Sequence, residues 1–160
     1  MGTKLRPGEL EPNWLGVKGS DRLSIRVEGY QYQHLDATTD STYDPNWLNI
    51  QGRVETRERS WKFVDACLLT WEAAELLEWM RAFPEVEKLK FLESLFTFDA
   101  DPDHKRLIRV RIRGGAFPPE GDPEEKWTEG FELFLNIGEQ QRERFIQTLT
   151  YDLERYPNRG

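Results

Sequence analysis

The stretch DACLLTWEAAELLEWM (residues 65–80) decides how this chain folds, because its apolar spacing changes halfway along. It continues the segment WKFV, whose alternation of apolar and polar residues is typical of a β-strand. From Trp71 onward the apolar residues recur at helical spacing, at positions Ala73, Leu76, Leu77, Met80 and Phe83. Thr70 is a suitable N-cap, and Pro84 ends the helix. The stretch therefore predicts a strand that turns directly into a helix.

Two further strands are predicted before this junction. RLSIRV (22–27) and NWLNIQGRVETR (46–57) both place apolar residues on one face. These residues are Leu23, Ile25 and Val27 in the first segment and Leu48, Ile50 and Val54 in the second. The alternation slips at Gly29, and a glycine at such a slip predicts a β-bulge. Between the two strands, DATTDSTYDPN (36–46) is rich in turn formers and predicts a loop.

The second half of the chain repeats the order of three strands and a helix. We predict strands at 88–99, 106–113 and 131–137, a loop at 114–130, and a helix at 139–156. Short links between strands imply antiparallel pairing, and helices after runs of strands imply an α+β fold. We therefore expect one domain over residues 1–160, with residues 1–20 loosely ordered. It would be an antiparallel sheet or sandwich of six or more strands with two helices.

Composition excludes several classes of protein. The 160 residues carry a net charge of -7, which argues against nucleic-acid binding through the whole surface and favours a basic partner. The single cysteine cannot form an internal disulfide, which fits a reducing compartment. The chain has no run of about 18 apolar residues and no apolar signal core at its start, so we expect no membrane span and a cytoplasmic location.

The residues with catalytic or metal-binding potential do not combine into a site. His34 and His104 lack partners at metal-ligand spacing, and we expect no metal and no cofactor. The acids of DADPDHK (99–105) miss the glycine and glutamate that a calcium loop requires, so this segment predicts a hairpin turn. Cys67 lies in the apolar run ACLL and is interpreted as a core residue. An enzyme that uses Cys67 as a nucleophile is the least favoured of three classes of function. The two non-catalytic classes that rank above it are given at the end of this subsection.

Arg109, Arg111 and Arg113 share one face of a predicted strand. Aligned guanidinium groups can hold a phosphate, or they can pair with acids on neighbouring strands. Because the chain is acidic, we favour cross-strand pairing.

The loop at 118–130 is the candidate partner-binding segment. Its residues with this role are Glu120, Asp122, Glu124, Glu125, Trp127 and Glu129, and Lys126 is its only base. Acidic groups steer a basic partner, and tryptophan is a frequent anchor in interfaces. The alternative is a solvated loop whose tryptophan packs on the core. A second acidic surface is predicted on the outer side of the first helix, formed by Glu72, Glu75 and Glu78 with Trp79 at its edge.

Three segments of the chain resemble the WapI-like immunity proteins, and the resemblance covers roughly residues 20–160. The segments are YDPNWLNIQGRVET, SWKFVDACLLTWEAAELLEWM and KLKFLESLFTF. The matching residues are Asn46, Trp47, Leu48, Trp61, Leu68, Leu69, Thr70, Trp71, Glu72, Phe91, Leu92, Glu93 and Leu95. The third segment reads ESL where the family pattern has EPNL.

The resemblance implies a small bacterial cytoplasmic protein that protects a cell against a contact-dependent toxin. It implies a non-catalytic protein that binds a basic toxin domain, a nuclease being the first candidate, through its acidic surface. Trp47, Trp61, Thr70 and Trp71 then belong to the scaffold, with Trp71 packing the first turn of the helix over the sheet. The alternative is a cytosolic interaction module that has no toxin partner.

Overall fold

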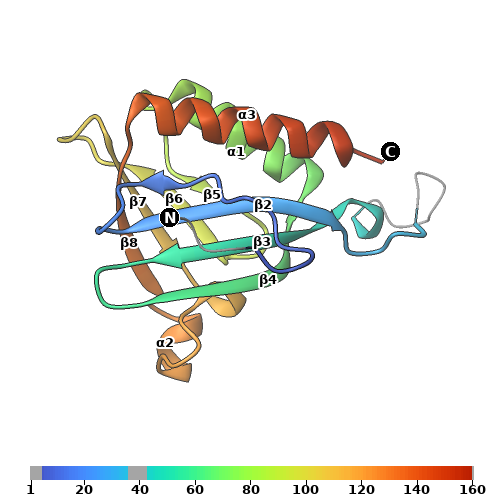
Figure 1. The fold of residues 1–160 in the computed structure, drawn as a ribbon, viewed down its shortest axis with the longest axis horizontal. Coiled ribbons are helices and arrows are strands. Elements are labelled where there is room, and N and C mark those ends of the chain that lie inside the picture. The colour runs from blue at the N-terminus through green and yellow to red at the C-terminus, as the bar shows by residue number, and fades with distance from the viewer. Residues whose placement is uncertain (1–4, 36–42, 160) are drawn as a thin grey trace.

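Two four-stranded antiparallel sheets form the framework of the molecule (Figure 1). A computed structural model describes residues 5–35 and 43–159. The first sheet contains, in spatial order, β1 (Leu15–Gly16), β2 (Arg22–Tyr30), β3 (Trp47–Glu55) and β4 (Ser60–Leu69). The second contains β5 (Leu89–Lys90), β6 (Phe96–Ala100), β7 (Leu107–Ile112) and β8 (Phe131–Asn136). The expected α+β class with antiparallel pairing is confirmed.

Two long helices cover one side of these sheets. α1 (Thr70–Ala82) continues directly from β4, and α3 (Glu139–Arg155) follows β8. Figure 1 shows both helices above the strands, with α3 running along β2. The short helix α2 (Pro123–Trp127) lies at the opposite end of the molecule, and two 3₁₀ turns, η1 (Asp44–Asn46) and η2 (Gly114–Ala116), complete the described elements. Within the described ranges, no helix is both long and apolar enough to cross a membrane.

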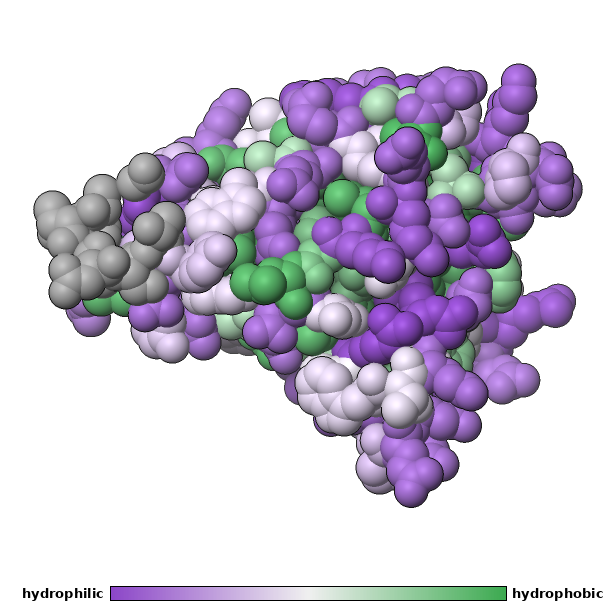
Figure 2. Space-filling model, turned by 180° about the vertical axis from the view of Figure 1, so that it is seen from behind, coloured by the Kyte–Doolittle hydropathy of each residue, from purple (hydrophilic) through white to green (hydrophobic). Residues whose placement is uncertain are grey.

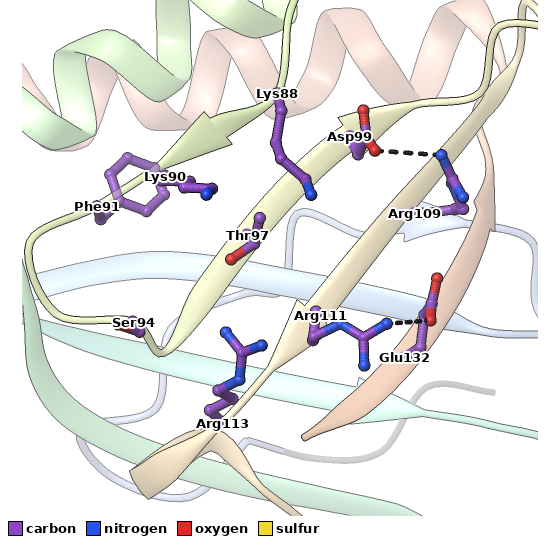
Figure 3. A pocket seen from close by; sticks show the side chains of 10 residues that line it. All are labelled: Lys88, Lys90, Phe91, Ser94, Thr97, Asp99, Arg109, Arg111, Arg113 and Glu132. Carbon is purple, nitrogen blue, oxygen red and sulfur yellow. Dashed lines mark hydrogen bonds and ion pairs between the residues drawn. The ribbon is translucent and has the colours of Figure 1, made fainter. Parts of the chain in front are cut away.

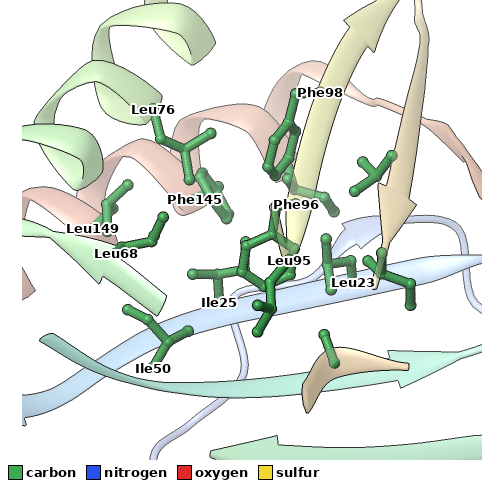
Figure 4. Packing of buried hydrophobic residues seen from close by; sticks show 14 of the residues in the cluster. Leu23, Ile25, Ile50, Leu68, Leu76, Leu95, Phe96, Phe98, Phe145 and Leu149 are labelled. Carbon is green, nitrogen blue, oxygen red and sulfur yellow. The ribbon is translucent and has the colours of Figure 1, made fainter. Parts of the chain in front are cut away.

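One hydrophobic core joins both sheets and both long helices (Figure 4). Leu23 and Ile25 of β2 face Phe96 and Phe98 of β6, and Phe145 of α3 closes the same space. All five side chains are at most 1% exposed, so each contributes about 1.5–3 kcal/mol of burial free energy. The core fixes the two sheets relative to each other.

The strand-to-helix junction forms where it was predicted, but its cap differs. Thr70 is the first residue of α1, so its prediction as the N-cap is wrong. Its hydroxyl donates instead to Asn46 Oδ1 at 2.9 Å. The buried carboxylate of Glu72 binds a different pair of donors, because it accepts from the backbone N–H of Leu69 at 3.0 Å and of Leu92 at 2.7 Å. One carboxylate thus joins the start of α1 to the segment between β5 and β6.

The predicted bulge at Gly29 is confirmed by a shift in the register of β2 and β3 between Val27 and Gly29. The strand predicted at 88–99 is wrong as one element, because β5 and β6 are separated by a turn. The loop predicted at 114–130 contains η2 and α2. Most of the loop predicted at 36–46 lies outside the described residues.

The segment before residue 20, which we expected to be loosely ordered, contains β1 and the fully buried Asn13. The Asn13 side chain donates to Ile25 O at 2.8 Å and accepts from Ile25 N at 2.9 Å. These bonds attach this part of the segment to β2. Loose order stays a prediction for residues 1–4, which are outside the described ranges.

Four of the six tryptophans divide into two buried and two half-buried side chains. Trp61 is 8% exposed, and its indole N–H donates to Ala116 O at 2.9 Å. Trp79 is also buried, with its N–H on Glu87 O at 2.6 Å. Trp47 and Trp71 are only half-buried, and the ring of Trp71 lies 5.6 Å from that of Tyr43. A scaffold role for Trp47, Thr70 and Trp71 stays a prediction.

Candidate partner-binding surface

Residues 118–130 form an acidic turn built around α2. Its carboxylates are those of Glu120, Asp122, Glu124, Glu125 and Glu129, and all five residues are exposed. The turn projects from the end of the molecule opposite the long helices (Figure 1). Repulsion between neighbouring acids is weakened by water at such an exposed site. The acidic turn therefore presents its negative charge directly to a partner.

Local hydrogen bonds hold α2 at both ends. Asp122 is the N-cap, and its carboxylate accepts from Glu124 N at 2.9 Å. At the other end Gly130 N donates to Glu125 O at 2.7 Å, and the positive φ of 71° at this position is one that glycine adopts readily. The acids are thus carried by a defined turn.

Two arginines at the C-terminal end of β7 attach the acidic turn to the second sheet. Arg113 Nε donates to Thr128 O at 2.9 Å, and Arg111 Nη1 donates to Glu129 O at 2.5 Å. Both acceptors follow the last turn of α2, where a cation is favourable. Turn and sheet are therefore expected to move as one unit, which lowers the ordering cost of binding.

Trp127 is 63% exposed and lies on the acidic turn. One edge of its ring approaches Gly114, where a Cβ would lie 2.7 Å from Trp127 Cη2. Gly114 also has a φ of 58°, so glycine is required at this position for two reasons. The sequence alternative, in which this tryptophan packs on the core, is wrong because most of the ring is open to solvent.

Asp65 and Glu93 extend the negative charge beyond the acidic turn, and sequence reasoning did not identify them as site residues. Burial raises the pKa of Asp65, the charge of Glu93 raises it further, and Lys126 lowers it. Asp65 also lies so close to Gly115 that a Cβ there would meet Asp65 Oδ2 at 2.1 Å. The sequence signal for Asp65 is that it is the single acid of β4 and precedes the apolar end of that strand.

The second acidic surface predicted on the first helix is wrong in part. Glu75 and Glu78 are exposed, but Glu72 is 5% exposed and binds two backbone amides. Trp79 is buried instead of lying at a surface edge. Two acids remain on this face of α1, and Glu78 pairs with Arg81.

The predicted cross-strand pairing of the arginine row is confirmed for two of its members. Arg109 pairs with Asp99 at 3.1 Å and Arg111 with Glu132 at 2.7 Å, each across the strand register. Arg113 donates to a backbone carbonyl, as described above. Figure 2 shows the molecule from behind, where strongly hydrophilic side chains gather directly above the lower projection formed by α2.

The other candidates for chemistry are dispersed. His34 and His104 are exposed, and the described residues contain no group of three or more metal-ligating side chains. The hairpin predicted at 99–105 is confirmed, since it joins β6 to β7. Cys67 is 0% exposed, and burial raises the pKa of its thiol well above its ordinary value. A buried, protonated thiol is a poor nucleophile.

The fold is thus that of an α+β protein with two antiparallel sheets around one core and an acidic turn at one end. Residues 14–157 match the Immunity protein WapI-like family, and the chain belongs to this family. The resemblance found in the sequence is therefore confirmed, and the chain belongs to a family of immunity proteins. A search among curated proteins finds no match.

Proposed function

We propose that this protein neutralises a bacterial toxin by direct binding, without catalysis, in the cytoplasm. Family membership supports the immunity role, and the acidic turn supports the mode of binding. The observation that carries the proposal is the exposed Trp127 on a turn that bears five carboxylates and is hydrogen-bonded to the sheet.

The carboxylates and Trp127 have different roles in the proposed binding. The carboxylates attract a basic toxin domain and raise the rate of encounter. Trp127 supplies the apolar contact that holds the complex, because a large rigid ring buries much area at little entropic cost. A nuclease fits this partner class, since its substrate-binding surface is positively charged. Covering that surface blocks access to nucleic acid.

The direct test is calorimetric titration of the protein with the C-terminal domain of a toxin encoded upstream of its gene. We expect a tight complex that weakens as salt rises, because exposed charges are screened. Glu124→Lys with Glu125→Lys should weaken it strongly. Trp127→Ala should cost about 2 kcal/mol of binding, the size of an interface hot spot.

Two control variants separate the acidic turn from net charge alone. Glu58→Lys with Glu154→Lys makes the same charge change at exposed positions outside the turn. Glu75→Lys with Glu78→Lys makes it on the exposed face of α1. Equal weakening by all three pairs, or no complex, would reject binding through the acidic turn. A tight complex with an unrelated cytosolic protein in place of the toxin domain would favour the interaction module.

A further inference from the structure

A basic pocket lies on the outer face of the second sheet (Figure 3). Strand register explains its composition, because Lys90, Thr97, Arg111 and Glu132 are successive partners across β5, β6, β7 and β8. Side chains at directly paired positions share one face of a sheet. The pocket is therefore formed by side chains at paired positions of the second sheet.

The charge of the basic pocket is opposite to that of the protein. Its charged lining residues are Lys88, Lys90, Arg109, Arg111 and Arg113, with Asp99 and Glu132 as the two acids. The lining therefore has an excess of three positive charges in a chain whose net charge is -7. A hollow lined mainly by one sign of charge concentrates ions of the other sign.

Three of these cations form no ion pair with a carboxylate in the part of the chain that the structure describes. Within residues 5–35 and 43–159, no ion pair joins Lys88, Lys90 or Arg113 to an acid. The only side-chain hydrogen bond of Arg113 in those ranges is that of Nε, which leaves both terminal amino groups for a ligand. Figure 3 shows Lys88 and Arg113 reaching toward Thr97 from opposite sides. Among the described residues, Arg109 Nε is buried without a hydrogen-bond partner, although Arg109 Nη2 pairs with Asp99.

The shape and donors of the pocket indicate the ligand. Its volume is about 320 Å³, near the lower end for small-molecule sites. The hydroxyls of Ser94 and Thr97 and the ring of Phe91 line the same space. A phosphate monoester carries about two negative charges at neutral pH and has three oxygens that accept hydrogen bonds. It matches this excess charge and these donors better than a carboxylate with its single charge.

We propose that the basic pocket binds the phosphate group of a small phosphorylated molecule. Arg113 binds two phosphate oxygens through its terminal amino groups, and Lys88 and Lys90 contribute charge from β5 and the residues before it. Thr97 donates its hydroxyl from the floor. Arg109 and Arg111, which are paired with Asp99 and Glu132, add their field rather than direct bonds. This site is separate from the carboxylates of the acidic turn, and it goes beyond toxin binding.

The test is calorimetric titration at low salt with two probes, inorganic phosphate and adenosine 5′-monophosphate. We expect a Kd of about 1 mM or below for at least one probe. Equal Kd values for the two probes would mean that the phosphate group alone accounts for binding. Clearly tighter binding of the monophosphate identifies an organic phosphate, with its remaining atoms in the space beside Phe91.

Lys88→Gln with Lys90→Gln removes two cations that form no ion pair among the described residues, so the fold should be retained. We expect this double variant to weaken binding about tenfold. The matched control is Lys18→Gln with Lys105→Gln, which removes the same charge at exposed positions outside the pocket. The control should change the Kd by no more than about twofold.

Three results would overturn the proposal. The first is the absence of binding by either probe at low salt, and the second is equal weakening by both double variants. The third is preferential binding of a glutamate-rich peptide at the basic pocket, which would make it a contact for an acidic partner segment. None of these results affects the test of toxin binding. That test substitutes Glu124, Glu125 and Trp127, none of which lines the basic pocket.

Discussion

Arg26 of β2 and Asp152 of α3 form a buried, bidentate ion pair between residues 126 positions apart. Arg26 Nε donates to Asp152 Oδ2 at 2.9 Å, and Nη2 donates to Oδ1 at 2.8 Å. Asp152 Oδ2 also accepts from Val27 N at 3.0 Å. The hydrogen bond to Asp152 raises the pKa of Arg26, so the guanidinium stays charged inside the protein. This pair fixes α3 along β2.

Asp152→Ala should lower the free energy of unfolding by about 3–5 kcal/mol, because it leaves a buried guanidinium without its counter-ion. Urea unfolding followed by circular dichroism measures the change. Glu154→Ala is the matched control on the same helix, since Glu154 is exposed, and it should change stability by less than about 0.5 kcal/mol. Equal effects would mean that the ion pair does not hold α3.

Glu72→Ala should cost about 2–4 kcal/mol, because it removes the acceptor of two backbone N–H groups at the start of α1 and before β6. Glu75→Ala on the exposed face of the same helix should have little effect. The comparison is made by urea unfolding at one pH. A Glu72→Ala protein as stable as Glu75→Ala would show that water replaces the lost acceptor.

The pH dependence of stability provides a separate check on Glu72. Burial raises the pKa of this carboxyl above its ordinary value of 4.5. Since the folded-state pKa is above the unfolded one, the stability from Glu72 is complete below the unfolded pKa and is lost as pH rises through the folded pKa. The stability difference between the natural protein and Glu72→Gln should therefore shrink from about pH 4 to pH 7. A difference that grows over this range would contradict the sign.

Trp61→Ala should cost about 3–5 kcal/mol, as expected for a buried aromatic side chain. Trp71→Ala should cost clearly less, about 1–2 kcal/mol, because Trp71 is only half-buried. Thermal melts of the two variants give the ranking. The reverse order would mean that Trp71 closes the core and Trp61 does not.

Cys67 should react with a thiol reagent only when the protein opens. The thiol is fully buried and burial keeps its pKa high, so both access and thiolate formation are suppressed. The rate with a chromogenic disulfide reagent should rise steeply through the urea transition. Rapid labelling of the native protein would instead revive the interpretation of Cys67 as a nucleophile.

Periodicity alone predicted most of the framework, because alternation and helical spacing are local properties of a chain. Leu48, Ile50 and Val54 alternate because β3 is buried on one face, and all three are buried as predicted. The helix α2 was missed because five residues of mixed polarity carry no period. The single strand predicted at 88–99 fails because a local apolar run does not reveal where the chain turns.

Sequence reasoning located the acidic turn but not its support. The carboxylates and Trp127 are adjacent in the chain, so their spacing is readable directly. Arg111 and Arg113 reach the turn only because β7 and α2 are brought together, and Asp65 approaches Gly115 for the same reason. Glu72 was assigned to a solvated face because helical spacing does not show which segment covers that face.

The sequence by itself determined the α+β class, the strand-to-helix junction at Leu69 and Thr70, the acidic turn and the family. The junction and the acidic turn rest on residues close together in the chain, where local sterics and hydrophobic spacing decide the structure, and the fold class and the family follow from the order of such local segments. Only the tertiary structure decided the burial of Glu72, the Arg26–Asp152 pair, and the basic pocket formed by the row from Lys90 to Glu132. These features depend on strand register and on long-range packing, because charges distant in sequence meet only when one core holds both sheets and α3 together.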